Sequence, residues 1–108
     1  MKLTILERIV VSRFLPVKAD YELLKTSEDF KPSIVFDEEE SRKYDISGKT
    51  DENGRQMVTF NKDSAEGYVK DIKFPPTISA YISKTLKELS EKGEITAELI
   101  PIYEKFVL

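Results

Sequence analysis

Carboxylates are the side chains in this sequence best suited to acid–base or metal chemistry near neutral pH, because the chain contains no histidine and no cysteine. Without cysteine, thiol nucleophiles, disulfides, zinc–thiolate sites and iron–sulfur clusters are all excluded. Without histidine, the chain lacks the commonest general base and the commonest nitrogen ligand of metals. Catalysis would therefore need a pair of carboxylates that converge in a cleft and differ in pKa.

The acidic residues of the middle region do not form an Asp-rich loop of the EF-hand type. Those that could in principle hold Mg²⁺ or Ca²⁺ are Asp45, Asp51, Glu52, Asp63 and Glu66. Their spacing lacks the EF-hand positions, and the segment 51–54, Asp-Glu-Asn-Gly, is typical of a tight turn. The glycines are isolated, so no phosphate-binding loop is present, and no Ser-x-x-Lys nucleophile motif occurs. The sequence predicts a protein that is not an enzyme and holds no cofactor or metal.

The acidic run 37–40 is the first part of a candidate interaction surface. Residues 36–66 carry five basic and nine acidic side chains, whereas the flanking regions are nearly neutral. These carboxylates could contact a basic protein, or they could simply complement the dipole of a helix that begins at Asp37. Aromatic residues with a polar tip are enriched at protein interfaces, and of these we expect Tyr103 to be exposed. The complete candidate surface is Asp37, Glu38, Glu39, Glu40, Tyr68, Lys70 and Tyr103.

The partner classes differ in how well they fit the charge pattern. No Lys/Arg cluster is present, and no apolar run approaches the roughly 18–20 residues of a membrane span. Three helices followed by a hairpin would suit a winged-helix DNA-binding protein, but the acidic start of the third helix would repel phosphate. Nucleic acid is therefore the disfavoured alternative to a protein partner. The predicted edge strand 68–74 could pair with a second copy in a homodimer, or Lys70 and Lys73 could prevent such pairing.

Helix signals dominate the first part of the chain. Thr4 and Glu7 form a possible capping box for a helix that extends to Leu15 and ends before Pro16. A second helix is predicted from the N-cap Asp20 to about Phe30, and Pro32 should end it. Tyr21 and Leu24 should face inward, and Leu23 could join them. A short third helix is predicted over residues 37–43. The apolar run 34–36 before it could equally be the end of a strand.

The second part of the chain predicts strands and then helices. Segments 44–50 and 55–61 flank Asn53-Gly54, a strong hairpin signal, and the alternation over 68–74 indicates a third strand. An amphipathic helix should follow Pro75 and end near Gly93. A last helix should start at Thr96 and be bent or delayed by Pro101. The expected fold is α+β, about five helices packed on a small antiparallel sheet made of the hairpin and the third strand, in a single domain spanning residues 1–108.

Motifs at the two ends of the chain resemble those of a group of short, uncharacterised phage and prophage proteins. The similar segments are Met1-Lys2-Leu3-Thr4, Glu7-Arg8-Ile9-Val10, Leu15-Pro16, Ile95-Thr96 and Tyr103-Glu104-Lys105-Phe106-Val107. These segments are helix caps and core positions, so the resemblance carries over no catalytic residue. It implies a small accessory protein of phage type that acts in the cytoplasm of a bacterial host. Together with the missing catalytic residue types, it predicts a function in protein–protein interaction.

Overall fold

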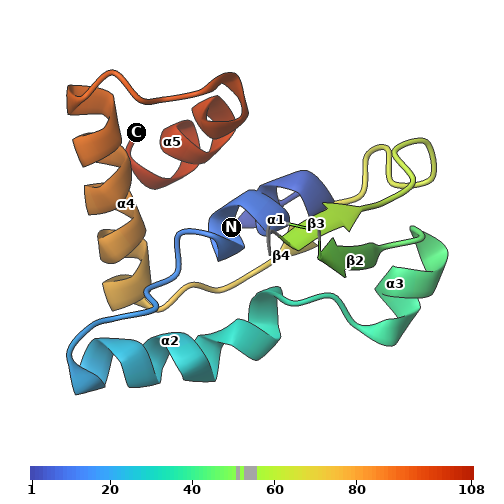
Figure 1. Cartoon of the computed structure of the whole chain (residues 1–108), viewed down its shortest axis with the longest axis horizontal. Helices are drawn as coiled ribbons and strands as arrows, with labels where there is room; N and C mark the ends of the chain where they lie inside the picture. Colours follow the sequence, from blue (N-terminus) through green and yellow to red (C-terminus); the bar gives the residue numbers. More distant parts are fainter. Residues whose placement is uncertain (51, 53–55) are drawn as a thin grey trace.

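The computed structural model describes residues 1–50, 52 and 56–108, and it has the expected α+β class (Figure 1). Helices supply most of the packed structure, and the strands are short. The elements, in chain order, are β1 (Lys2–Leu3), α1 (Ile5–Ser12), α2 (Tyr21–Ile34), α3 (Glu38–Lys43), β2 (Ser47–Thr50), β3 (Gln56–Thr59), β4 (Lys70–Asp71), α4 (Pro76–Glu91), the 3₁₀ helix η1 (Ala97–Leu99) and α5 (Ile100–Phe106).

Helix α1 begins with the predicted capping box. The Thr4 hydroxyl accepts from the Glu7 N–H at 3.1 Å, and the Glu7 carboxylate accepts from the Thr4 N–H at 2.9 Å. The helix ends at Ser12, earlier than the predicted Leu15. The reason is that the Arg13 and Phe14 N–H groups bond the carbonyls three residues before them, which tightens the last turn and lets Leu15 enter the core.

Helix α2 corrects two predictions. Asp20 caps it as expected, but the helix continues through Pro32 to Ile34 instead of stopping near Phe30. Pro32 lies on the exposed side, and the burial of Phe30 and Ile34 around it compensates for the backbone bond that proline cannot donate. Tyr21, predicted to face inward, is 79% exposed, since the buried face runs through Ser27 instead.

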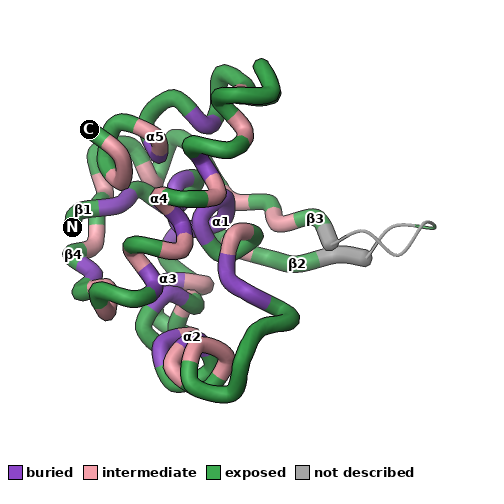
Figure 2. The backbone as a smooth tube through the Cα atoms, turned by 90° about the vertical axis from the view of Figure 1, so that its left-hand side faces the viewer, coloured by how far each residue is buried: buried purple, intermediate pink, exposed green. Residues whose placement is uncertain are grey.

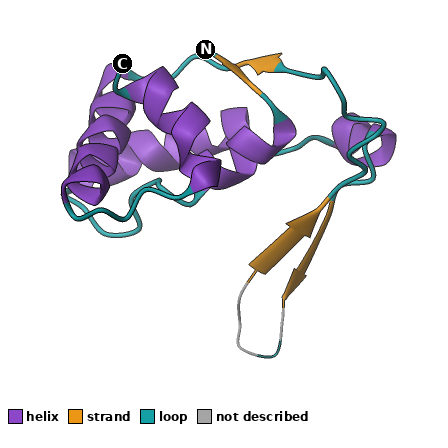
Figure 3. Cartoon of the chain, turned by 90° about the horizontal axis from the view of Figure 1, so that it is seen from above, coloured by secondary structure: helices purple, strands orange, loops and turns teal. Residues whose placement is uncertain are grey.

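Helix α3 and the hairpin agree with the sequence patterns. Asp37 caps α3 in a second capping box, and residue 34 belongs to α2, so the run 34–36 is not a strand end. Strands β2 and β3 pair antiparallel, with Ser47 opposite Thr59. The predicted turn residues Asn53 and Gly54 lie outside the described residues. The hairpin projects from the helical body as an arm (Figures 2 and 3).

The predicted third strand does not join the hairpin. Only Lys70–Asp71 is a strand, β4, and it pairs antiparallel with β1, so the described chain has two separate two-stranded sheets. The Ile72 N–H also bonds the Met1 carbonyl at 2.8 Å. Burial explains why β4 pairs with β1, because this pairing brings Leu3 and Ile72 into the same core cluster.

Helices α4 and α5 complete the body. Ile78, Ile82 and Leu86 are fully buried along one face of α4, and Gly93, with a φ of +70°, follows its end as predicted. The last segment starts as the 3₁₀ helix η1 and becomes α5 at Ile100, with Pro101 in the first turn. The predicted delay at Pro101 is therefore confirmed.

Two hydrophobic clusters hold these elements together. The first lies between α1, α2, α4 and α5, and Phe74 contacts Phe30 and Phe106 in it, with ring centroids 4.8 and 5.1 Å apart. The second is smaller and is centred on Ile5, Ile9 and Tyr44. Half-buried residues of the hairpin and of the segment after it cover this second cluster; they are Ile46, Val58, Phe60, Ala65 and Tyr68. The second cluster thus anchors α3 and the arm on α1.

Candidate functional site

Most of the predicted interaction residues gather around α3. Asp37, Glu39, Glu40 and Tyr68 line a shallow pocket of about 180 Å³. Lys70 also lies here, since its Nζ is 3.9 Å from a Glu40 carboxylate oxygen.

The other two predicted residues lie outside this pocket. Glu38 lines a neighbouring open depression beside Phe36. Tyr103 lies apart from all of them, in a pocket of about 250 Å³ between the end of α4 and α5. It is half-buried against the first cluster, which corrects its predicted exposure.

The prediction that Glu40 and Tyr68 form part of an interaction surface is also corrected. Both side chains belong to an internal hydrogen-bond network. Arg8, 1% exposed, donates to both carboxylate oxygens of Glu40, at 2.6 and 3.3 Å. The Tyr68 hydroxyl donates to the same carboxylate at 2.6 Å. A buried charge must be paired and hydrogen-bonded to be tolerated, and both conditions are met here.

Arg8 is the important residue that the sequence reading missed. Besides Glu40, its guanidinium donates to the Ile34 carbonyl at 3.3 Å and the Val35 carbonyl at 2.9 Å, and it lies 4.3 Å from the centre of the Phe36 ring. It therefore fastens α1 to the end of α2 and to α3. The available signal was its position in α1, where Arg8 shares a buried face with Ile5 and Ile9.

The protonation states of this network are fixed by its contacts. Burial raises the pKa of Glu40, but the hydrogen bonds from Arg8, Tyr68 and the Asp37 backbone, together with the Arg8 charge, lower it to about 2. The hydrogen bond to the Glu40 carboxylate raises the pKa of Tyr68 to about 12, with burial acting in the same direction. Near neutral pH the carboxylate stays ionised and the phenol stays protonated. These two groups suit a structural role, not proton transfer.

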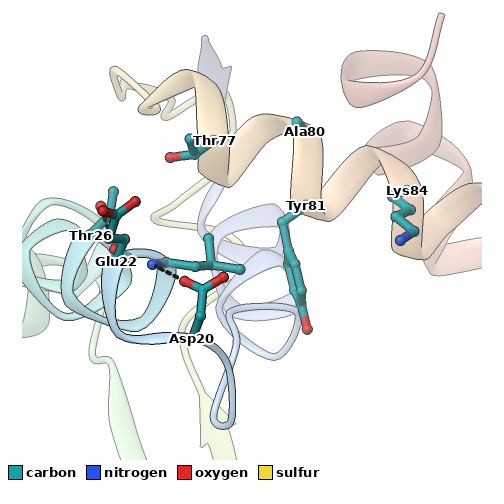
Figure 4. A pocket seen from close by; sticks show the side chains of 8 residues that line it. Asp20, Glu22, Thr26, Thr77, Ala80, Tyr81 and Lys84 are labelled. Carbon is teal, nitrogen blue, oxygen red and sulfur yellow. Dashed lines mark hydrogen bonds between the residues drawn. The ribbon is translucent and has the colours of Figure 1, made fainter.

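A larger surface feature, not predicted from the sequence, lies between α2 and α4. This α2–α4 groove has a volume of about 470 Å³ and is lined by Asp20, Glu22, Leu23, Thr26, Thr77, Ala80, Tyr81 and Lys84. In Figure 4 the half-buried Tyr81 ring extends from α4 toward the start of α2, where Asp20 lies. One Asp20 oxygen caps α2 by accepting from the Leu23 N–H at 2.9 Å.

The charged groups of the groove are available to a ligand. The ion pairs among the described residues involve neither Glu22 nor Lys84. Asp20, Glu22 and Lys84 are exposed, whereas Leu23 and Tyr81 are half-buried. The groove thus combines an apolar floor with charged groups at its rim, a composition found at protein-binding sites.

Clusters of metal-binding side chains and membrane-spanning helices are both absent from residues 1–50, 52 and 56–108. In this part of the chain no three acidic side chains lie close enough together to hold a metal ion. None of its helices has the length and apolarity needed to cross a bilayer. The volume and the mixed lining of the α2–α4 groove make it the candidate functional site that the geometry favours.

Comparison of the chain with models of known protein families, with curated proteins and with solved structures found no match.

Proposed function

We propose that the protein is a non-catalytic accessory protein, of the phage type that its resemblance implies, and that it acts in the bacterial cytoplasm by binding another protein. The observation that carries this proposal is the α2–α4 groove. The groove has a volume of about 470 Å³, and its lining mixes apolar, aromatic and charged side chains.

The groove supports this function better than the acidic surface of α3 does. Two members of that surface, Glu40 and Tyr68, are engaged with Arg8 and cannot reach a partner without breaking the internal network. Glu38 and Glu39 remain exposed, but they stand in the first turn of a six-residue helix whose dipole they complement. Asp20 and Glu22 stand at the start of α2 in the same way, so the feature that distinguishes the groove is the half-buried Leu23 and Tyr81 in its lining.

The alternative function is that of a nucleic-acid-associated regulator. The order α1, α2, α3 and hairpin resembles that of a winged helix. Two features weaken this alternative: α3 is short, and its first turn carries Glu38, Glu39 and Glu40. Like-charge repulsion from phosphate would lower affinity at that position.

Affinity capture combined with groove variants tests the proposal. The purified, tagged protein is incubated with a lysate of its source organism, beside the groove variant Leu23→Asp/Ala80→Asp and the α3 control Arg42→Gln/Lys43→Gln, both of which lower the net charge by two. Circular dichroism and thermal unfolding establish that all three are folded. We expect a protein partner that the wild type and the α3 control retain and that the groove variant loses. If nothing is retained and the wild type shifts duplex DNA at about 150 mM salt, the proposal is wrong.

A further inference from the structure

The charges at the α2–α4 groove indicate the chemistry of its ligand. Its lining contains two carboxylates, Asp20 and Glu22, on the α2 side and one ammonium group, Lys84, on the α4 side. The Tyr81 ring stands between these two sides and is half-buried. A cation placed near the α2 side would therefore meet carboxylates and an aromatic ring together.

We propose that the groove binds an arginine- or lysine-bearing segment of a partner protein, with the basic side chain between the Asp20 and Glu22 carboxylates and the Tyr81 ring. This inference rests on the proposed protein-binding function and specifies its partner. Charge complementarity supports it, since the acidic side of the groove attracts a basic group and the π-face of a tyrosine binds cations. Leu23 and Ala80 supply apolar surface for the residues on either side of the basic one.

Lys84 gives the bound segment a direction. It lies on α4 away from Asp20, at the other end of the groove (Figure 4). Its ammonium group can donate to a backbone carbonyl or to an acidic side chain of the same segment. A segment with a basic residue at one end and an acceptor at the other therefore fits one orientation and not the reverse.

Two matched peptides test the inference directly. The probes are a capped Ala-Leu-Arg-Leu-Ala peptide and the same peptide with neutral citrulline in place of arginine. Titration of the isotope-labelled protein is followed by two-dimensional NMR. We expect the arginine peptide to shift the amide signals of residues 20–26 and 77–84, and to bind about three- to fivefold more tightly than the citrulline peptide.

Two variants with equal charge changes separate the groove from the general acidity of the protein. Asp20→Asn/Glu22→Gln should abolish the preference for arginine while keeping the N-cap of α2, because asparagine also caps helices. Glu38→Gln/Glu39→Gln removes the same charge from α3 and should leave the preference unchanged. Equal binding of both peptides to the wild type, or no binding of either, overturns the inference.

The proposed function is tested separately from this inference. If the wild type retains a protein partner through the groove but shows no preference for arginine, the protein-binding function stands and only the assignment of a basic segment fails. A Tyr81→Leu variant provides a further check. Leucine keeps apolar bulk at this position but removes the π-face, so affinity for the arginine peptide should fall while affinity for the citrulline peptide is retained.

Discussion

Arg8 links helix α1 to the end of α2 and to α3. Its guanidinium contacts the end of α2, α3 and, through Glu40, the tyrosine that precedes β4. Burying two charges costs solvation free energy, which their mutual attraction offsets only when both are fully hydrogen-bonded. Arg8 satisfies this condition with four hydrogen bonds. The pair therefore specifies one arrangement of α1 and α3 more than it adds stability.

A double-mutant cycle on Arg8 and Glu40 tests this role. Arg8→Met leaves the Glu40 carboxylate buried without its main partner, and we expect the free energy of unfolding to fall by about 3–5 kcal/mol. The double variant Arg8→Met/Glu40→Met removes both charges. Its loss in the free energy of unfolding should be much smaller than the sum of the losses of the two single variants. Urea unfolding measures all four proteins. Additive losses would show that the two residues do not interact energetically.

The low pKa of Glu40 predicts a specific acid sensitivity. Its carboxylate has a pKa of about 2 in the folded protein and about 4.5 when free, so its ionised form stabilises the fold above pH 4.5. This contribution, on the order of 3 kcal/mol, is lost as the pH falls from about 4.5 to 2. Urea unfolding at several pH values should show a smaller loss over this range for Glu40→Gln than for the wild type. Parallel pH profiles would contradict the assignment.

Ser27 presents the opposite situation, a buried polar atom without a partner. Its hydroxyl oxygen is inaccessible to solvent and makes no hydrogen bond in the described part of the chain. A buried, unsatisfied hydroxyl destabilises the fold, and alanine has the higher helix propensity. Ser27→Ala should therefore raise the free energy of unfolding by up to about 1 kcal/mol in chemical denaturation. A loss of stability would mean that the hydroxyl has a partner after all.

At the scale of elements, local sequence patterns were sufficient to predict where helices begin. They were not sufficient to predict which strands pair. The caps Thr4, Asp20 and Asp37 lie where the sequence predicts them, because capping involves residues only three apart. The pairing of β4 with β1 joins segments at Lys2 and Asp71, and no local pattern contains that information. The continuation of α2 through Pro32 likewise depends on burial against distant residues.

The cap of α3 gives an element-scale prediction. The Asp37 carboxylate accepts from the Glu40 N–H at 2.7 Å, and this bond also holds Glu40 in place for Arg8. Asp37→Ala should lower the free energy of unfolding by about 1 kcal/mol. Asp37→Asn should cause a much smaller loss, because asparagine also caps helices. Thermal and urea unfolding of both variants measure the difference. Equal losses would indicate that charge, and not capping, is the contribution of Asp37.

At the scale of the whole molecule, the candidate site arises from packing that the sequence does not display. The groove brings the start of α2 beside α4, two segments separated by about half of the chain (Figure 1). The sequence predicts the amphipathic character of α4, but it does not show that the half-buried Tyr81 of this helix lines a groove against α2. The homodimer through 68–74 stays a prediction, and it would have to use the edge of β4 that β1 does not occupy.

Site-specific photocrosslinking measures most directly whether a protein occupies the α2–α4 groove. A benzophenone amino acid is placed at Thr77, on the exposed rim of the groove, and in a control protein at Glu38 on α3. After irradiation in cells of the source organism, crosslinked species are identified by mass spectrometry. We expect one defined protein adduct from position 77 and none from position 38. No adduct from position 77, or the same adducts from both positions, would contradict it.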